Sequence, residues 1–367
     1  MRRHFFRGSH RTWWLKQRDA RKRTKLAKEA GRRRNRNATA WHRSPKRVHT
    51  AVLKVPVHLV AEREEQRAKL RQVIDSAFEI LMRGNSRVRF DFSSVAKIFP
   101  GGMLLFLAHL ELLQLSFPGR VLVRVPPGSI VSQLLQHFGL AEKLGLPPTT
   151  VSPSHESVVH WRYLTGTRAD GPKITELLNS YRNTVNAEIP EGLYDVLAEA
   201  FTNVRQHAFP QGDKTFEDLK RWWLFSRYVA PSGKTAGSLY IGVYDIGVGI
   251  QRSMRAKLTS GEIVFDIADE VMLAFNAGKN RILEKLLLSR AVDHERSSTG
   301  LGNRGLGLPE MKAFVLQTQS GRLYILSGRA QYTCFASQGE GFVSGCETSF
   351  PGTLILWSIP VHQKAGV

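Results

Sequence analysis

Asp245 begins the segment Asp245-Ile246-Gly247-Val248-Gly249, in which a carboxylate is followed by two glycines. The residues before it, 238–244, alternate as a β-strand does. A carboxylate at a strand end can accept a hydrogen bond from a base edge, and glycines let the backbone approach a ligand closely. The segment therefore indicates a base-binding strand end, although an ordinary turn can have the same pattern.

A second glycine-rich segment, residues 300–308, precedes a helical stretch at 309–316. Glycines at the start of a helix let backbone N–H groups and the helix N-terminus face phosphate oxygens. The segment lacks the Gly-Lys-Ser/Thr ending of a P-loop, and no strand directly precedes it as in a dinucleotide-binding fingerprint. A phosphate-binding loop of another kind and a flexible connection both fit this pattern.

Glu199 and Asn203 lie four residues apart in a segment whose apolar residues have helical spacing. Those residues, at i, i+3, i+4, i+7, i+8 and i+11, are Leu193, Val196, Leu197, Ala200, Phe201 and Val204. They predict one apolar face of a helix that begins after residues 190–192 and ends at 209–210. Glu199 and Asn203 then lie one turn apart on a second face, and His207 follows four residues later. Taken alone, the pair also fits a solvated helix surface.

The elements that must position these residues follow a fixed order: a Glu-x-x-x-Asn helix, a strand ending in Asp-x-Gly-x-Gly, and a glycine-rich loop opening a helix. Two strand-like runs, 322–327 and 354–359, close the set, with Thr353 between them. Chance agreement of all three motifs in this order is low. Over residues 173–361 the arrangement strongly resembles the GHKL superfamily of ATPases, which includes gyrase, a heat-shock chaperone family, histidine-kinase catalytic domains, anti-sigma serine kinases and MutL.

This resemblance implies a Bergerat-type α/β sandwich, with a mixed sheet and helices on one face, that binds ATP and Mg²⁺. Asn203 would coordinate the Mg²⁺ that bridges the phosphates, and a carboxamide oxygen suits this hard cation. Glu199 would position or deprotonate the attacking water or hydroxyl. Asp245 would accept a hydrogen bond from the adenine amino group, while Gly247 and Gly249 would let the chain pass close to the nucleotide.

By the same resemblance, Gly305 and Gly307 would open the phosphate loop, and Thr353 would help to hold the water network around Asp245. Residues 251–304 would form a mobile lid that closes over the ligand. His207, and with it Arg205, would reach phosphate from the helix. The γ-phosphate contact would come from a lid cation, for which the sequence offers Lys279, Arg281, Arg290 and Arg304.

Residues 51–148 form a separate candidate body. Residues 87–92 and 119–125 have strand patterns, whereas 68–81, 103–115 and 130–138 have helical spacing. Strand, helix, strand, helix predicts a parallel sheet with helices packed on it, so the whole chain is expected to be of the α/β (α+β) class.

The first body looks like a STAS-like domain, the fold of anti-sigma-factor antagonists, and a generic small α/β domain is the alternative. The resemblance depends on Asp91-Phe92-Ser93-Ser94-Val95 and on Phe99-Pro100-Gly101-Gly102, which opens a helix. Phosphorylatable antagonists carry Ser or Thr at that helix start, where this chain has Pro and Gly. The resemblance therefore implies docking of a protein partner.

The segments outside the two bodies have distinct compositions. Residues 149–172 are rich in Ser, Pro, His and Gly and are expected to form a linker. Residues 1–50 hold 18 Lys and Arg against Asp19 and Glu29, and so carry +16 of the net charge of +22. This basic arm has few aliphatic residues, so we expect it to be disordered. It is a candidate nucleic-acid-binding segment, or else a solvated tail.

Composition excludes several classes of protein. The 367 residues contain two cysteines, Cys334 and Cys346, too few for a disulfide scaffold and without metal-site spacing. The longest apolar stretch, 103–117, is interrupted by polar residues and is shorter than the ~20 apolar residues of a membrane span. We therefore expect a cytoplasmic protein that does not enter membranes.

The leading hypothesis is an ATP-binding regulatory or signalling protein of the GHKL type, which hydrolyses ATP slowly or uses it to switch partner interactions. Within the GHKL superfamily, the sequence most resembles the anti-sigma-factor serine kinases, so a serine protein kinase is the second hypothesis. The basic arm favours a third, a nucleic-acid-associated ATPase of a mobile element or defence system. A purely structural pseudo-ATPase is the last.

Overall fold

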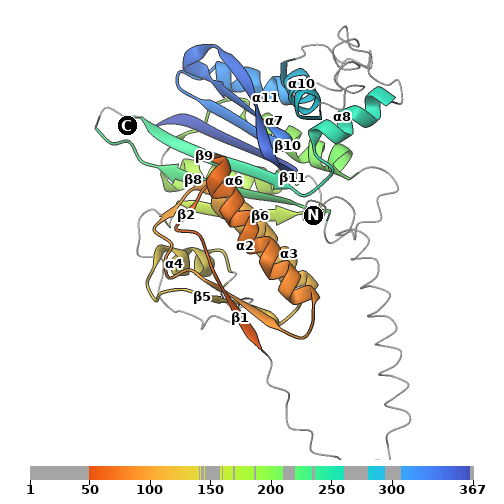
Figure 1. The fold of residues 1–367 in the computed structure, drawn as a ribbon. Helices are drawn as coiled ribbons and strands as arrows, with labels where there is room; N and C mark the ends of the chain where they lie inside the picture. Colours follow the sequence, from red (N-terminus) through yellow and green to blue (C-terminus); the bar gives the residue numbers. More distant parts are fainter. Residues whose placement is uncertain are drawn as a thin grey trace, which may run out of the picture.

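The described residues of the computed structural model form two main β-sheets, a small two-stranded pair, and helices packed on both sheets (Figure 1). The residues it describes are 49–139, 141, 144, 158, 160–167, 170–185, 187–209, 220–233, 236–259, 280–293 and 307–363. The basic arm up to residue 48 and Gly305 lie outside the described residues, as do 260–279 and 294–304 of the expected lid, which include Arg304.

The first body contains a parallel sheet, as predicted. Its strands, in the order β1-β3-β5, are β1 (Thr50–Lys54), β3 (Arg87–Asp91) and β5 (Val121–Arg124). A small parallel pair joins β2 (His58–Leu59) to β4 (Lys97–Ile98). The helices of this body are α2 (Glu64–Met82), α3 (Pro100–Ser116) and α4 (Ile130–His137). The apolar spacing in the sequence had placed all three within a few residues.

The second sheet is antiparallel in every pair that the structure describes, so the expectation of a mixed sheet was wrong. Its path, β10-β11-β9-β8-β6, has a short sixth strand, β7, against β11. The strands are β6 (Trp161–Gly166), β7 (Ala187–Glu188), β8 (Trp222–Val229), β9 (Gly237–Asp245), β10 (Arg322–Phe335) and β11 (Glu340–Gln363). Hairpins connect β8 to β9 and β10 to β11, and a hairpin fixes antiparallel pairing.

Helices cover one face of the second sheet (Figure 1). They are α6 (Gly171–Thr184), α7 (Leu193–Asn203), α8 (Ile250–Thr259), α10 (Asn280–Asp293) and α11 (Gly307–Leu316). A buried cluster that includes Leu197, Phe201, Leu288 and Val315 joins α7, α10 and α11 to the sheet. This face is the one that carries the predicted site residues.

The opposite face of the second sheet is covered by helix α3 of the first body. Phe106 packs edge-on against Phe90 and Phe92 near the parallel sheet, with ring centroids 5.2 and 5.1 Å apart. On the other side of α3, a β-carbon on Gly242 of β9 would lie 3.0 Å from the side chain of Leu104. Residues 103–108 are all buried, because a helix between two sheets is apolar all round. The two bodies thus share one continuous core.

The expected linker, 149–172, contains a strand of the second sheet, so that part of the prediction was wrong. β6 pairs with β8 along its whole length, from Trp161 with Arg227 to Gly166 with Trp222. The Ser- and Pro-rich composition around it obscured a short strand whose partner lies some 60 residues later in the chain. None of the helices that the structure describes combines the length and apolar character needed to cross a membrane.

Candidate nucleotide-binding site

Helix α7 carries Glu199 and Asn203 as predicted. It begins at Leu193 after Gly192, whose φ of 81° is a left-handed conformation that favours glycine. The α-helical hydrogen bonding ends at Asn203, and a π-helical turn, Val204–Ala208, follows and includes His207. Such turns within helices are frequent at functional sites, because they change the direction of the side chains.

Glu199 lies against the first residue of α11, which joins the first and third sequence motifs in space. A β-carbon on Gly307 would overlap the side chain of Glu199, so any larger residue there would displace the Glu199 carboxyl group. The side chain of Glu199 is half-buried, and its pKa is raised by burial and by the nearby carboxylate of Glu310. A carboxylate with a raised pKa beside a helix N-terminus is suited to accept a proton from a nucleophile.

Asn203 has a buried carboxamide nitrogen with no hydrogen-bond partner among the residues that the structure describes. Leaving a buried polar group unpaired costs roughly 1–3 kcal/mol, so such a group usually has a partner in the functional state. The oxygen of the same carboxamide is the kind of ligand that Mg²⁺ accepts while keeping several of its waters. This residue therefore fits a metal-nucleotide complex.

Asp245 ends strand β9 and is 5% exposed. The backbone N–H groups of Gly247, at 2.7 Å, and of Thr353 donate hydrogen bonds to its carboxyl group. Burial raises the pKa of Asp245 to about 7, and these two hydrogen bonds partly oppose that shift. Thr353 is also the register partner of Asp245 across β9 and β11. The structure thus joins these two predicted residues directly.

The two glycines after Asp245 each occupy a place that a side chain could not. A β-carbon on Gly247 would overlap backbone and side-chain atoms of Ala208, at the end of the π-helical turn. Val248 donates a backbone hydrogen bond of 2.8 Å to the same Ala208 carbonyl. Gly249 has a φ of 81°, and a β-carbon there would lie 2.8 Å from the hydroxyl of Ser327. The loop after β9 is thereby seated against the end of the Glu199 helix.

Sequence reasoning missed Ser327 and Gln251, which tie this loop to the sheet. The Ser327 hydroxyl accepts from the backbone N–H of Ile250 at 2.9 Å and donates to the Gly352 carbonyl at 3.0 Å. Gln251 donates from its side chain to the Ser327 carbonyl at 2.6 Å. Ser327 directly follows a continuous apolar run, 323–326, which is only a weak signal of a buried polar residue at its end.

The sequence predicted a mobile lid over residues 251–304. One helix in this segment, α10, is instead firmly packed. In α10, Leu287, Leu288 and Val292 are fully buried. Glu284 of the same helix accepts a backbone hydrogen bond from Arg329 of β10. Among the candidate γ-phosphate cations, Arg281 pairs with Glu347 at 2.8 Å and points toward the β11 side. Arg205 is exposed, and Arg304 and Lys279 lie outside the described residues.

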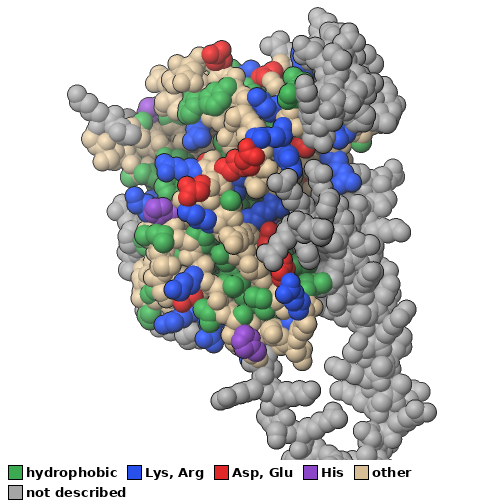
Figure 2. All heavy atoms as spheres, viewed as in Figure 1, with side chains coloured by type: hydrophobic (Ala, Val, Ile, Leu, Met, Phe, Trp, Pro, Cys, Tyr) green, Lys and Arg blue, Asp and Glu red, His purple; other side chains and the backbone are tan. Residues whose placement is uncertain are grey.

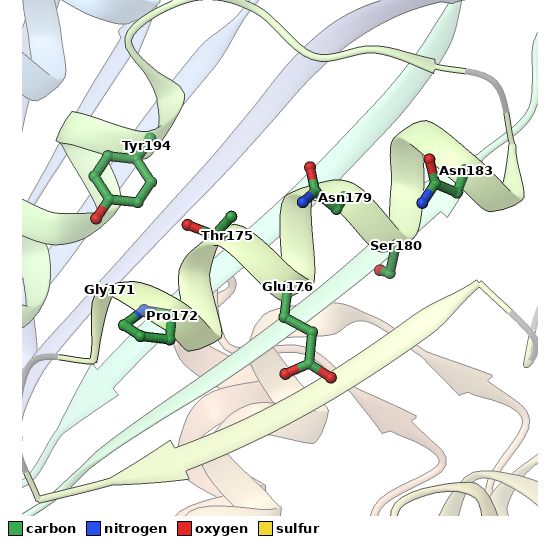
Figure 3. Close-up of a pocket in the computed structure, with 8 residues that line it drawn as sticks. All are labelled: Gly171, Pro172, Thr175, Glu176, Asn179, Ser180, Asn183 and Tyr194. Atoms are coloured by element: carbon green, nitrogen blue, oxygen red, sulfur yellow. The ribbon is translucent and has the colours of Figure 1, made fainter.

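A surface depression of about 770 Å³ lies away from these residues, along the outer side of α6 (Figure 3). It is lined by Gly171, Pro172, Thr175, Glu176, Asn179, Ser180, Asn183 and Tyr194. Its only charged side chain is the carboxylate of Glu176, whereas a triphosphate requires cations or backbone donors. The depression is therefore a poor candidate for the nucleotide.

Glu199 thus meets Gly307, and Asp245 meets Gly247 and Thr353, where α7, the end of β9, β11 and the start of α11 come together, while Gly305 and Arg304 stay predictions. Groups of three or more His, Cys, Asp or Glu side chains able to hold a metal are absent from the described ranges. A site with one carboxamide ligand and several waters would not form such a group. No family model, curated protein or solved structure matches this chain.

Proposed function

We propose that the chain binds Mg-ATP between α7, the end of β9 and the start of α11, as an ATP-binding regulatory protein of the GHKL type. The observation that carries the proposal is the buried carboxyl group of Asp245, which two backbone N–H groups orient at a strand end. Its remaining hydrogen-bonding capacity suits the amino group of adenine. The glycines at 247 and 249 bring the backbone close beside it.

The phosphate end of the ligand would lie toward Glu199 and Asn203. Asn203 would hold Mg²⁺ through its carboxamide oxygen, and the cation would neutralise phosphate charge. Gly307 places the N-terminus of α11 against Glu199, where helix N–H groups favour anions. Glu199 would orient the attacking oxygen and accept its proton. Phosphoryl transfer requires mainly such positioning and charge stabilisation.

Whether the attacking oxygen belongs to water or to a protein serine divides an ATPase from a serine kinase, and the described residues fit both. The first body covers the back of β9 through α3, so nucleotide binding and partner docking would be linked through one core. Incubation with γ-labelled ATP, with and without candidate partner proteins, separates the two reactions: free phosphate indicates an ATPase, and label on a serine of the partner indicates a kinase.

The binding proposal is tested by thermal unfolding with Mg-ATP. A ligand that binds only the folded state stabilises it by RT ln(1 + [L]/Kd). We expect ATP at 100 times Kd to raise the unfolding midpoint of the parent by a few degrees, from about 2.7 kcal/mol of stabilisation. Asp245→Asn should lose most of this shift, because its amide would present a donor where adenine also donates.

A matched control is Asp195→Asn in the first turn of α7, outside the proposed site. It should retain the full shift, since Asp195 is exposed. Equal shifts in the parent and in Asp245→Asn would contradict the assigned pocket, and the absence of any shift in the parent would contradict ATP binding itself.

A further inference from the structure

Within the part of the chain that the structure describes, helices cover only one side of the three-stranded parallel sheet of the first body. Val88 and Phe90 of β3 are fully buried beneath the helices, whereas Arg87 and Arg89, which alternate with them, are exposed. Parallel sheets are almost always covered on both faces, and their strands then carry apolar residues on both. The outward face here carries charge instead, which indicates a surface adapted to a partner in solution.

Strand register places the outward residues in rows. Val52, Arg89 and Leu122 form one row across β1, β3 and β5, and Lys54, Asp91 and Arg124 form the next. Neighbouring strands lie about 4.8 Å apart, and successive outward residues on a strand about 7 Å apart. The cations Lys54, Arg87, Arg89 and Arg124 therefore form one compact patch, which we call the basic sheet face.

Two of the four cations of the basic sheet face, Lys54 and Arg124, lie near a carboxylate, and the other two do not. Its one carboxylate, Asp91, accepts hydrogen bonds from the backbone and hydroxyl of Ser93 and lies 3.8 Å from Arg124, which is 67% exposed. Neither Arg87 nor Arg89 forms a side-chain ion pair with another residue that the structure describes. All four of these basic side chains are exposed, so the patch projects a positive electrostatic potential into the solvent.

Helix α2 provides the contrast on the same body. Acidic and basic side chains are interspersed on the face of the molecule shown in Figure 2. On α2 the cations pair with carboxylates one turn away, as Lys69 does with Glu65 at 2.6 Å and Arg83 with Glu79 at 3.2 Å. These cations near α2 thus have carboxylate partners that Arg87 and Arg89 lack.

The basic arm enters the fold at this same sheet. Residues 1–50 carry +16, and β1, the first strand, begins at Thr50. In Figure 1, β1 lies at the far end of the molecule from α7 and α11. The arm and the basic sheet face are therefore adjacent along the chain, and the strand at which the arm joins the fold lies away from the candidate nucleotide site.

We propose that the basic sheet face binds the phosphate backbone of a nucleic acid, as a continuation of the basic arm. Backbone binding requires closely spaced cations and no base-reading groups, and the face carries no aromatic side chain for stacking. A membrane surface would need apolar area beside the charge, and the face exposes only Val52 and part of Leu122. The binding is independent of base sequence and of ATP.

The test uses the full chain, without ATP, and a fluorescent 20-base-pair DNA duplex of arbitrary sequence. Anisotropy titrations are made at several salt concentrations for the parent and for Arg87→Gln with Arg89→Gln. Each lost phosphate contact lowers the magnitude of the slope of log K against log salt by about 0.9. We expect the double variant to reduce it by nearly 2 and to bind about tenfold more weakly or worse at 0.1 M salt.

The matched control is Lys69→Gln with Arg83→Gln on α2, which removes the same charge and should leave affinity and slope near those of the parent. Both pairs are exposed, so unfolding midpoints should stay unchanged and exclude misfolding. Equal slopes for the parent and the Arg87/Arg89 variant would assign binding to the arm alone and overturn the proposal. It would also be overturned by binding only to phosphatidylserine vesicles, or by polyglutamate competing as well as unlabelled duplex.

Discussion

At the scale of single residues, the candidate site depends on glycines placed where a β-carbon has no room. Gly247 lies against backbone atoms of Ala208, and Gly352 against backbone atoms of Asp245. Backbone atoms cannot rotate out of the way as side-chain atoms can. These two close contacts therefore fix the distance between β9 and β11, and between β9 and the turn after α7. Asp245 and Thr353 keep their hydrogen bond because these close approaches are possible.

Gly247→Ala should therefore destabilise the fold and disrupt the site together. Overpacking a tight contact costs about 1–3 kcal/mol, and the fixed backbone of Ala208 favours the upper part of that range. Denaturant unfolding of the variant should show this loss, with the ATP-dependent shift also lost. Gly84→Ala is the control, because nothing lies within 4 Å of its added carbon. Equal stability of the two variants would contradict the packing argument.

At the scale of elements, helix α3 connects the first body to the second sheet through polar as well as apolar contacts. Glu111 accepts hydrogen bonds from the indole of Trp223 at 2.6 Å and the hydroxyl of Tyr163 at 3.2 Å, and it pairs with Arg221 at 3.4 Å. These three partners come from β8, β6 and the residue before β8. One carboxylate thus joins α3 to two strands of the other body.

Glu111→Ala should weaken the junction by about 2–4 kcal/mol, because it leaves the Arg221 guanidinium and two buried donors without their acceptor. The loss should appear in one cooperative transition, since the two bodies share a core. Glu65→Ala removes an exposed partner of Lys69 instead and should leave the unfolding curve unchanged. Two separate transitions in the Glu111→Ala variant would show that the bodies fold independently.

Local patterns in the sequence predict the elements whose burial is one-sided, and they fail where pairing is distant. The apolar face of α7 and the alternation before Asp245 located both elements and their polar residues. By contrast, β6 depends on β8 some 60 residues away, and no local pattern encodes that pairing. The apolar run in α3 signalled burial, but not that the helix would lie between two sheets.

The residues of the candidate site also fall into those that local patterns predict and those that they do not. Residue types and spacing identified Glu199, Asn203 and Asp245, because each motif is local. Ser327 and Gln251 escaped notice since their importance comes from contacts made only in the folded chain. The packing of Gly247 on Ala208 likewise joins two segments that are forty residues apart in sequence.

At the scale of the whole molecule, two buried titratable groups sit on either side of β9 and oppose each other in their pH dependence. His109 of α3 stacks on Tyr244, with ring centroids 5.8 Å apart, and Asp245 is the next residue of the strand. Burial lowers the pKa of His109 from 6.5 to about 4 and raises that of Asp245 from 3.8 to about 7. Both groups are therefore neutral over much of the range between pH 4 and 7.

The signs of the two contributions follow from linkage. Between pH 4 and 6.5 the unfolded state binds more protons at His109, so this term makes the free energy of unfolding fall on acidification, by up to about 3 kcal/mol. Between pH 3.8 and 7 the folded state binds more protons at Asp245, so that term makes the free energy of unfolding rise on acidification, by up to about 4 kcal/mol. In the parent the two slopes largely cancel from pH 4 to 6.5.

Removing either group should expose the slope of the other. Asp245→Asn should lose stability as the pH falls from 6.5 to 4, whereas His109→Gln should gain stability on acidification from pH 7 to 4, each relative to the parent profile. Urea unfolding of the three proteins at half-unit pH intervals measures both slopes. If all three profiles had the same shape, the two side chains would have ordinary pKa values, and neither face of β9 would bury its titratable group as the structure shows. The opposite slopes would instead show that both faces of β9 are dry at this point, one beneath α3 and the other at the candidate site, so that a single strand joins the first body to the nucleotide site.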